Sequence, residues 1–188
     1  MGLRPAPSRL AETLVGWLIP PASREHVVGD LHERYRAPLQ YFWEATLTVP
    51  MVVASRIRRT TDPGVFLMEA LAVYASFLVA AWWQLGVAFL TSENGLVRLS
   101  APTAAALAAV VLAVAYADPQ KRWALQPLHQ AVLGVGCAFL WEGLVGFAWP
   151  GWHVPLGIMI GGGGMSILLL SALRMLFPPD EQKPRGAS

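Results

Sequence analysis

Long runs of apolar residues fill the last two thirds of the 188-residue chain. They cover residues 65–90, 101–117, 128–149 and 153–177, and only the second is short. Each run is close to the ~20 residues that a helix needs to cross ~30 Å of hydrocarbon. The pattern predicts an all-α integral membrane protein whose four transmembrane helices lie within residues 63–178.

The segment before the first run has the spacing of short amphipathic helices. One apolar stripe stops at Pro20 and Pro21, and its members lie three or four residues apart: Leu10, Leu14, Trp17 and Leu18. A second helix, which Ser23 can cap and Pro38 ends, has four apolar residues on one face: Val27, Val28, Leu31 and Tyr35.

A third stretch of the N-terminal segment, residues 41–57, is rich in aromatic and apolar residues and ends in a cluster of arginines: Arg56, Arg58 and Arg59. One interpretation is an interfacial helix along the inner leaflet, with the arginines facing lipid headgroups. The other is an ordinary globular helix folded back on the first two. Residues 1–62 are thus predicted to be a cytoplasmic or interfacial helical prefix, and residues 179–188 a disordered cytoplasmic tail.

The basic residues predict an orientation for the four spans. Eight of the 14 Lys and Arg residues precede residue 63, one (Arg98) lies in the first break, two lie in the second, and three follow near the C-terminus. With both termini in the cytoplasm, 13 of the 14 lie on the cytoplasmic side, as the positive-inside rule requires. We therefore expect a multi-pass protein of the bacterial inner (cytoplasmic) membrane with cytoplasmic N- and C-termini.

Composition narrows the expected partners. Only 14% of residues are charged, against roughly 25% in soluble domains, and the net charge is +2. The chain thus has few charges rather than a basic surface, so we expect no nucleic acid as partner. Other membrane proteins and membrane lipids, anionic on the cytoplasmic side, are the expected partners. The single cysteine, Cys137, excludes an intrachain disulfide and a zinc site built on several thiolates.

Residues 10–36 contain a Pro-Pro break, an Arg-Glu helix start and the string Gly-Asp-Leu-x-Glu-x-Tyr, and an aromatic cluster at residues 41–43 follows. This segment resembles the cytoplasmic prefix domain found in front of some MacB-like ABC-transporter permeases. The resemblance implies a docking or regulatory module without catalytic residues, whose partner-docking candidates are Gly29, Asp30, Leu31, Glu33, Tyr35 and Trp43. The permeases' large extracytoplasmic domain is missing, since only residues 91–100 separate the first two runs.

Two polar residues lie deep in the predicted spans. Glu142 is about seven residues from the outer end of the third run, where an ionised carboxylate without a partner costs a few kcal/mol. Gln84 lies at similar depth on the first run, so the two could hydrogen-bond across the helices. A proton or cation pathway and contact with a partner subunit are the alternatives. Glu69, near the cytoplasmic end of the first run, is expected to reach water or the arginine cluster at residues 56–59.

Small residues and histidines are the remaining candidates within the spans. Gly161, Gly162, Gly163 and Gly164 would let helices approach closely, so we assign them to helix packing. His129 and His153 begin the third and fourth runs, and either is a candidate ligand of a haem or chlorin. They lie at opposite membrane faces and cannot share one haem. We expect bound lipid, no metal site and no other cofactor.

The chain offers no nucleophile, base and orienting group at plausible spacing, so we do not expect an enzyme. The predicted function is a non-catalytic accessory or scaffold subunit of a larger membrane complex, with energy-converting complexes among the candidates. It would dock through the cytoplasmic prefix and the glycine-rich spans. The alternative is a small transporter or a regulatory subunit of an ABC-type transport system.

Overall fold

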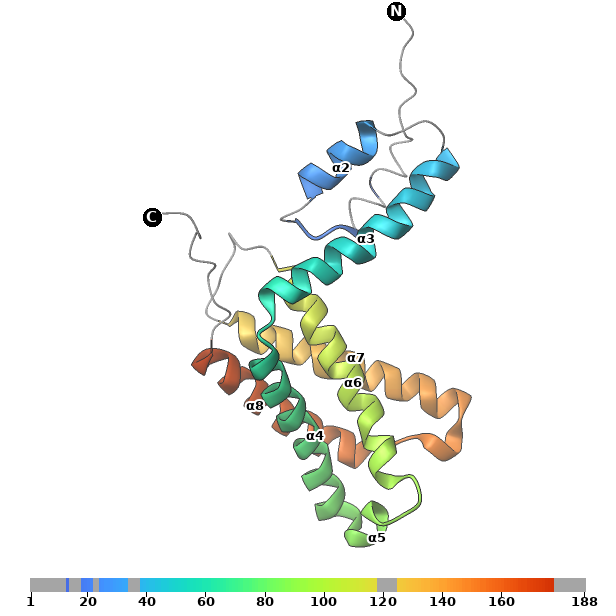
Figure 1. Ribbon diagram of the computed structural model, residues 1–188. Coiled ribbons are helices and arrows are strands. Elements are labelled where there is room, and N and C mark those ends of the chain that lie inside the picture. Colours follow the sequence, from blue (N-terminus) through green and yellow to red (C-terminus); the bar gives the residue numbers. More distant parts are fainter. Residues whose placement is uncertain (1–12, 14–17, 22–23, 34–37, 118–124, 178–188) are drawn as a thin grey trace, which may run out of the picture. The chain divides into compact units, whose positions relative to one another are not determined.

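The computed structural model describes most of the chain (Figure 1): residues 13, 18–21, 24–33, 38–117 and 125–177. The described residues form helices and loops and contain no strand. The chain divides into two compact units. The first comprises residues 1–59 with 115–122, and the second comprises residues 60–114 with 123–188.

The first unit contains α2 (Arg24–Glu33) and α3 (Pro38–Thr60). Pro38, expected to end the second helix, is instead the first residue of α3, where a missing N–H costs nothing because that group has no helical partner. The predicted stripe before Pro20 lies mostly outside the described residues, as do Ser23, Tyr35 and the C-terminal tail. Within this unit the hydroxyl of Tyr116 donates a hydrogen bond to the carbonyl oxygen of Leu18.

The second unit confirms the four predicted spans. Four of its helices are long and apolar enough to cross a membrane: α4 (Pro63–Leu85), α6 (Gly95–Ala115), α7 (Gln126–Ala148) and α8 (Leu156–Leu176). A one-turn helix, α5 (Val87–Leu90), lies between α4 and α6, and a 3₁₀ turn, η2 (Pro150–Trp152), joins α7 to α8.

Two helix boundaries differ from the hydropathy pattern. The first apolar run, predicted to continue to residue 90, breaks at Gly86, whose φ of 69° lies in the left-handed region that favours glycine. The second helix begins at Gly95 rather than residue 101 and is 21 residues long, so it is no shorter than α8. Arg98, which the hydropathy pattern placed in the break before this run, lies inside the first turn of the helix.

In the second unit, α8 runs antiparallel to α4 and to α7. Along the closely packed α4–α8 pair, Gln84 lies near Gly157 and Glu69 meets Arg174. Along α7 and α8, Glu142 meets Val154 and Gln130 meets Arg174. The start of α4 and the end of α8 therefore lie at one end, called here the Arg174 end. The opposite end, with the α7–α8 turn, is called the Glu142 end.

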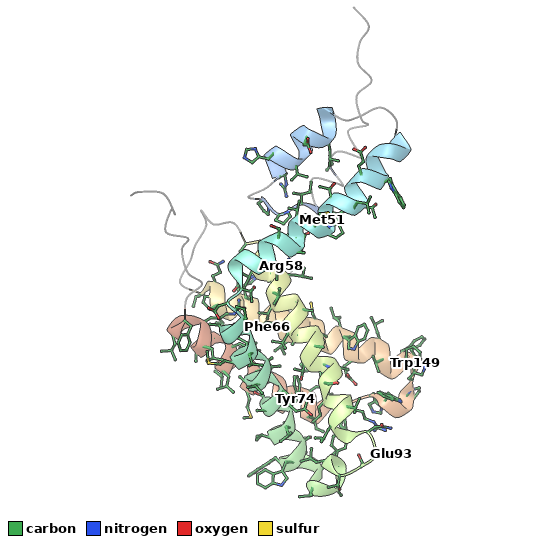
Figure 2. All side chains as sticks on the ribbon, in the orientation of Figure 1. Met51, Arg58, Phe66, Tyr74, Glu93 and Trp149 are labelled. Atoms are coloured by element: carbon green, nitrogen blue, oxygen red, sulfur yellow. The ribbon has the colours of Figure 1, made fainter. Side chains whose placement is uncertain are left out.

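Apolar side chains fill the inside of the second unit and also cover its outside. Figure 2 shows them along all four spans. The largest fully buried ones come from α4, α6 and α8: Val73, Phe77, Leu99, Val110, Ile158, Met159 and Leu170. On the outer faces, Trp83 is 85% exposed and Phe147 is 91% exposed. Helices that are apolar all round are typical of membrane spans, so these outer faces contact lipid or another membrane protein.

Candidate functional site

A cluster of three polar side chains joins three spans at the Arg174 end. The Arg174 guanidinium donates from Nε to Glu69 Oε1 at 2.6 Å and from Nη2 to Glu69 Oε2 at 3.1 Å. Its Nη1 donates to Gln130 Oε1 at 2.6 Å. The fork-on-carboxylate geometry is the strong, directional form of an Arg–Glu pair. One arginine on α8 thus holds a carboxylate on α4 and an amide on α7.

This charge pair is shielded from its surroundings. The side chain of Glu69 is 3% exposed and that of Arg174 is 12% exposed. A charge buried to this degree needs a partner, because removal of either one leaves the other uncompensated. The sequence led us to expect water or Arg56, Arg58 and Arg59 around Glu69. Instead, its partner is an arginine 105 positions further along the chain.

The second buried carboxylate closes the α7–α8 turn. Glu142 is 7% exposed, and its Oε1 accepts a hydrogen bond from the backbone N–H of Val154. That N–H lies just before α8, where no helical carbonyl is available to it. Next to it, the Nδ1 atom of His153 lies within hydrogen-bond distance of the carbonyl oxygen of Pro150. The carboxylate therefore stabilises the local turn.

The structure does not join Gln84 to Glu142. Gln84 packs on α8, where its amide atoms lie 2.2–3.0 Å from the point that a Cβ on Gly157 would occupy. Among the described residues no hydrogen bond links the two side chains. Glu142 thus forms its hydrogen bond with the backbone N–H of Val154 and not, as predicted, with Gln84.

Three of the four consecutive glycines on α8 face neighbouring helices. A Cβ on Gly162 would lie 2.5 Å from Phe77 Cδ1 and 2.9 Å from Phe77 Cα on α4. A Cβ on Gly163 would lie 2.9 Å from Val135 Cγ1 on α7. Gly161 faces Ala80 at an ordinary 3.4 Å, whereas nothing in the described structure lies within 4 Å of a Cβ on Gly164. Gly162 and Gly163 therefore allow close packing, and Gly164 leaves space.

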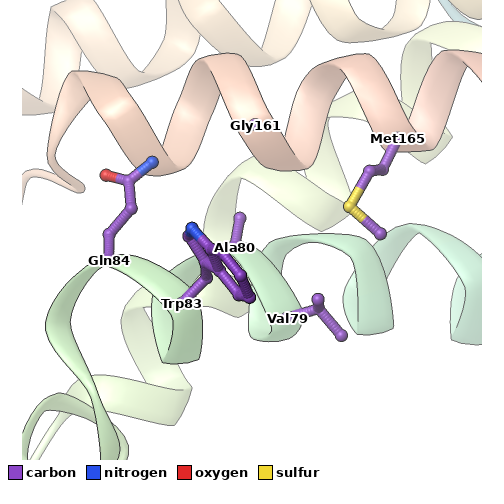
Figure 3. A pocket seen from close by; sticks show the side chains of 6 residues that line it. All are labelled: Val79, Ala80, Trp83, Gln84, Gly161 and Met165. Atoms are coloured by element: carbon purple, nitrogen blue, oxygen red, sulfur yellow. The ribbon is translucent and has the colours of Figure 1, made fainter.

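A groove of about 250 Å³ opens between α4 and α8 (Figure 3). Its lining is apolar apart from one amide, and consists of Val79, Ala80, Trp83, Gln84, Gly161 and Met165. Gln84 lies at the end of α4, so the amide marks the end of the groove nearest the Glu142 end. The exposed indole of Trp83 forms part of the rim.

The two histidine candidates lie at opposite ends of the second unit. His129 is exposed in the first turns of α7, at the Arg174 end, and His153 is exposed beside η2, at the Glu142 end. The structure therefore does not bring them to one cofactor. In the part of the chain that is described, no three His, Cys, Asp or Glu side chains gather as a metal site.

The docking candidates of the prefix differ in exposure. Gly29 and Asp30 are exposed on α2, and Trp43 is 68% exposed on α3. Leu31 is 3% exposed, so it contributes to packing inside the first unit rather than to an outer surface. The side chains of Glu33 and Tyr35 lie outside the described residues.

Comparison with family models, curated proteins and solved structures finds no match to this chain. The resemblance of residues 10–36 to a permease prefix domain stays a prediction. The function proposed below therefore rests on the residues and geometry of the chain itself.

Proposed function

We propose that this protein is a non-catalytic accessory or scaffold subunit of a larger membrane complex, and that it docks a helix of another membrane protein in the α4–α8 groove. The observation that carries the proposal is the groove itself. It is open, lies on the outer surface of two apolar spans, and ends in an amide.

The groove has the features that promote association of helices in lipid. Apolar surface alone does not drive helix pairing there, whereas small residues and polar contacts do. Gly161 lines the groove, and Gly164 leaves open space one turn further along α8. Met165 supplies a flexible side chain that adapts to a neighbour. The Gln84 amide can donate to and accept from a polar side chain of a partner helix.

The buried polar contacts support a scaffold role because they fix the positions of the spans. Arg174 holds α4 and α7 against α8 at one end, and Glu142 holds the α7–α8 turn at the other. A docking surface made of helices held in this way loses little conformational freedom when a partner binds.

The distribution of basic residues and one hydrogen bond support cytoplasmic termini. Four exposed tryptophans at the Glu142 end fit one of the two membrane–water interfaces, at either of which Trp is enriched: Trp82, Trp83, Trp149 and Trp152. In the sequence, 13 of the 14 basic residues belong to the segments that we expect on the cytoplasmic side. The Tyr116–Leu18 hydrogen bond also joins the segment after α6 to the prefix, which suits a shared cytoplasmic location.

Site-specific photo-crosslinking in the native membrane tests the proposal. A photoreactive residue at Met165 in the groove is expected to capture one membrane protein of defined mass. The matched control is Leu140, an apolar residue on α7 that is 72% exposed and does not line the groove. Gln84→Leu should reduce capture at position 165 several-fold. Lipid adducts alone at both positions, together with a lone monomer after mild detergent extraction, would refute docking.

A further inference from the structure

An exposed apolar stripe runs along α3. It consists of Trp43, Leu47 and Met51, which are 68%, 55% and 73% exposed. Their spacing of four residues places them on one side of the helix. Arg58 is exposed in the same register two turns further on, and Figure 2 labels it together with Met51.

The opposite side of α3 is less exposed than the stripe. Thr48, Val49 and Val52 are half-buried there. The stripe is therefore a second apolar face, and the described part of the chain does not cover it. Exposure of three large apolar side chains to water on one helix face is unfavourable. Such a patch is typical of a surface that binds an apolar partner or a membrane.

The position of α3 in the chain places its C-terminal end close to the membrane. Only Thr61 and Asp62 separate the end of α3 at Thr60 from the start of α4, the first membrane span, at Pro63. Three Cα–Cα steps cover at most about 11 Å. The C-terminal end of α3 is thus held within that distance of the point where α4 enters the bilayer.

We propose that the α3 stripe inserts into the leaflet that α4 enters, and that its occupant is an anionic phospholipid surface. A helix lying in this way buries its apolar side at the boundary of headgroups and acyl chains, where a tryptophan is also favoured. The charges are complementary, because the last turns of α3 carry Arg56, Arg58 and Arg59. Each arginine near an anionic surface shifts binding about fivefold toward the membrane. This inference does not depend on the α4–α8 groove.

Depth-dependent fluorescence quenching of the full chain tests the proposal. The protein carries Cys137→Ala and one environment-sensitive label at Leu47→Cys, and is held as a single copy in nanodiscs that contain phosphatidylglycerol. The control label is at His26→Cys, an exposed position on α2. We expect shallow spin-labelled lipids to quench the label at position 47 and iodide to quench the label at position 26.

Two results would overturn lipid insertion. Iodide quenching at position 47 as strong as at position 26 would show that the stripe faces water. Protection of position 47 from both quenchers would show that protein covers it. Both labels lie on exposed side chains, so neither substitution disturbs the core.

The charge contribution is tested separately. Arg58→Gln, or replacement of phosphatidylglycerol by phosphatidylcholine, should lower the docking equilibrium measured from iodide accessibility. The expected change for Arg58→Gln is about fivefold. Arg24→Gln, which removes an exposed arginine from α2, is the matched control and should have no effect. Equal docking in both lipids and in both variants would contradict an anionic surface.

Discussion

The Arg174 end and the Glu142 end of the second unit each bury a carboxylate, but they give it different partners. Glu69 binds a guanidinium on another span, 105 positions away. Glu142 binds a backbone N–H in its own hairpin, 12 positions away. The Glu69–Arg174 contact joins the first and last spans, α4 and α8. The Glu142–Val154 contact stabilises the turn between α7 and α8, whose short chain already holds these two helices together.

The comparison shows that buried polar groups in one bundle need not have one role. The Arg174 cluster fixes the register of α4, α7 and α8, because its three hydrogen bonds form only at matched depth. The glycine contacts at Phe77 and Val135 then bring the same helices close together. The Glu142 contact contributes to the turn alone, so the two ends should respond differently to substitution.

The largest effect is expected at the Arg174 end. Arg174→Ala leaves the Glu69 carboxylate buried and unpaired, which should destabilise the folded state by about 3–5 kcal/mol. Reversible unfolding in mild detergent or bicelles, followed by tryptophan fluorescence, measures the change. The double variant Glu69→Leu with Arg174→Met removes both charges and should recover most of the loss. Unfolding of Arg174→Ala like the wild type would contradict a paired interior charge.

The middle of α8 should show a smaller effect that differs between adjacent glycines. Gly162→Ala places a methyl group against the backbone of Phe77 and should cost about 1–3 kcal/mol. Gly164→Ala meets open space and should instead stabilise the helix, by up to about 1 kcal/mol. The same unfolding assay compares the two variants. Equal effects of the two would show that the close α4–α8 approach is not what Gly162 provides.

The smallest effect is expected for Glu142→Gln at the other end. The amide oxygen can still accept the Val154 N–H, so the change in unfolding free energy should stay below about 1 kcal/mol. Glu142→Leu provides the contrast, since it leaves that N–H unpaired and should cost about 1–3 kcal/mol. If Glu142→Gln folds normally but alters an uptake or efflux phenotype, the transporter alternative would gain over the scaffold.

Hydropathy predicted the number and approximate position of the spans because a run of about 20 apolar residues is a local property of the chain. The break at Gly86 depends on a backbone angle, and the early start of α6 places Arg98, a charged residue, inside a helix. Neither follows from hydropathy, because both depend on how the chain turns and packs.

The Arg174 cluster could not be predicted in the same way. In the sequence, Arg174 counts only as one of three basic residues near the C-terminus, yet it pairs with Glu69 from the last turn of α8. Pairing depends on the relative register of two helices that are distant in the chain. One available signal was depth, since Glu69 and Arg174 both lie near the same end of antiparallel spans. Gln130 offered no signal of its own.

The Glu69–Arg174 pair also imposes an order on biosynthesis. Glu69 is made 105 residues before its partner, and at 5–20 residues per second this interval lasts about 5–20 s. During that time the nascent first span carries a carboxylate without its arginine. We expect it to stay beside the insertion machinery or at the headgroups until the last turn of α8 emerges.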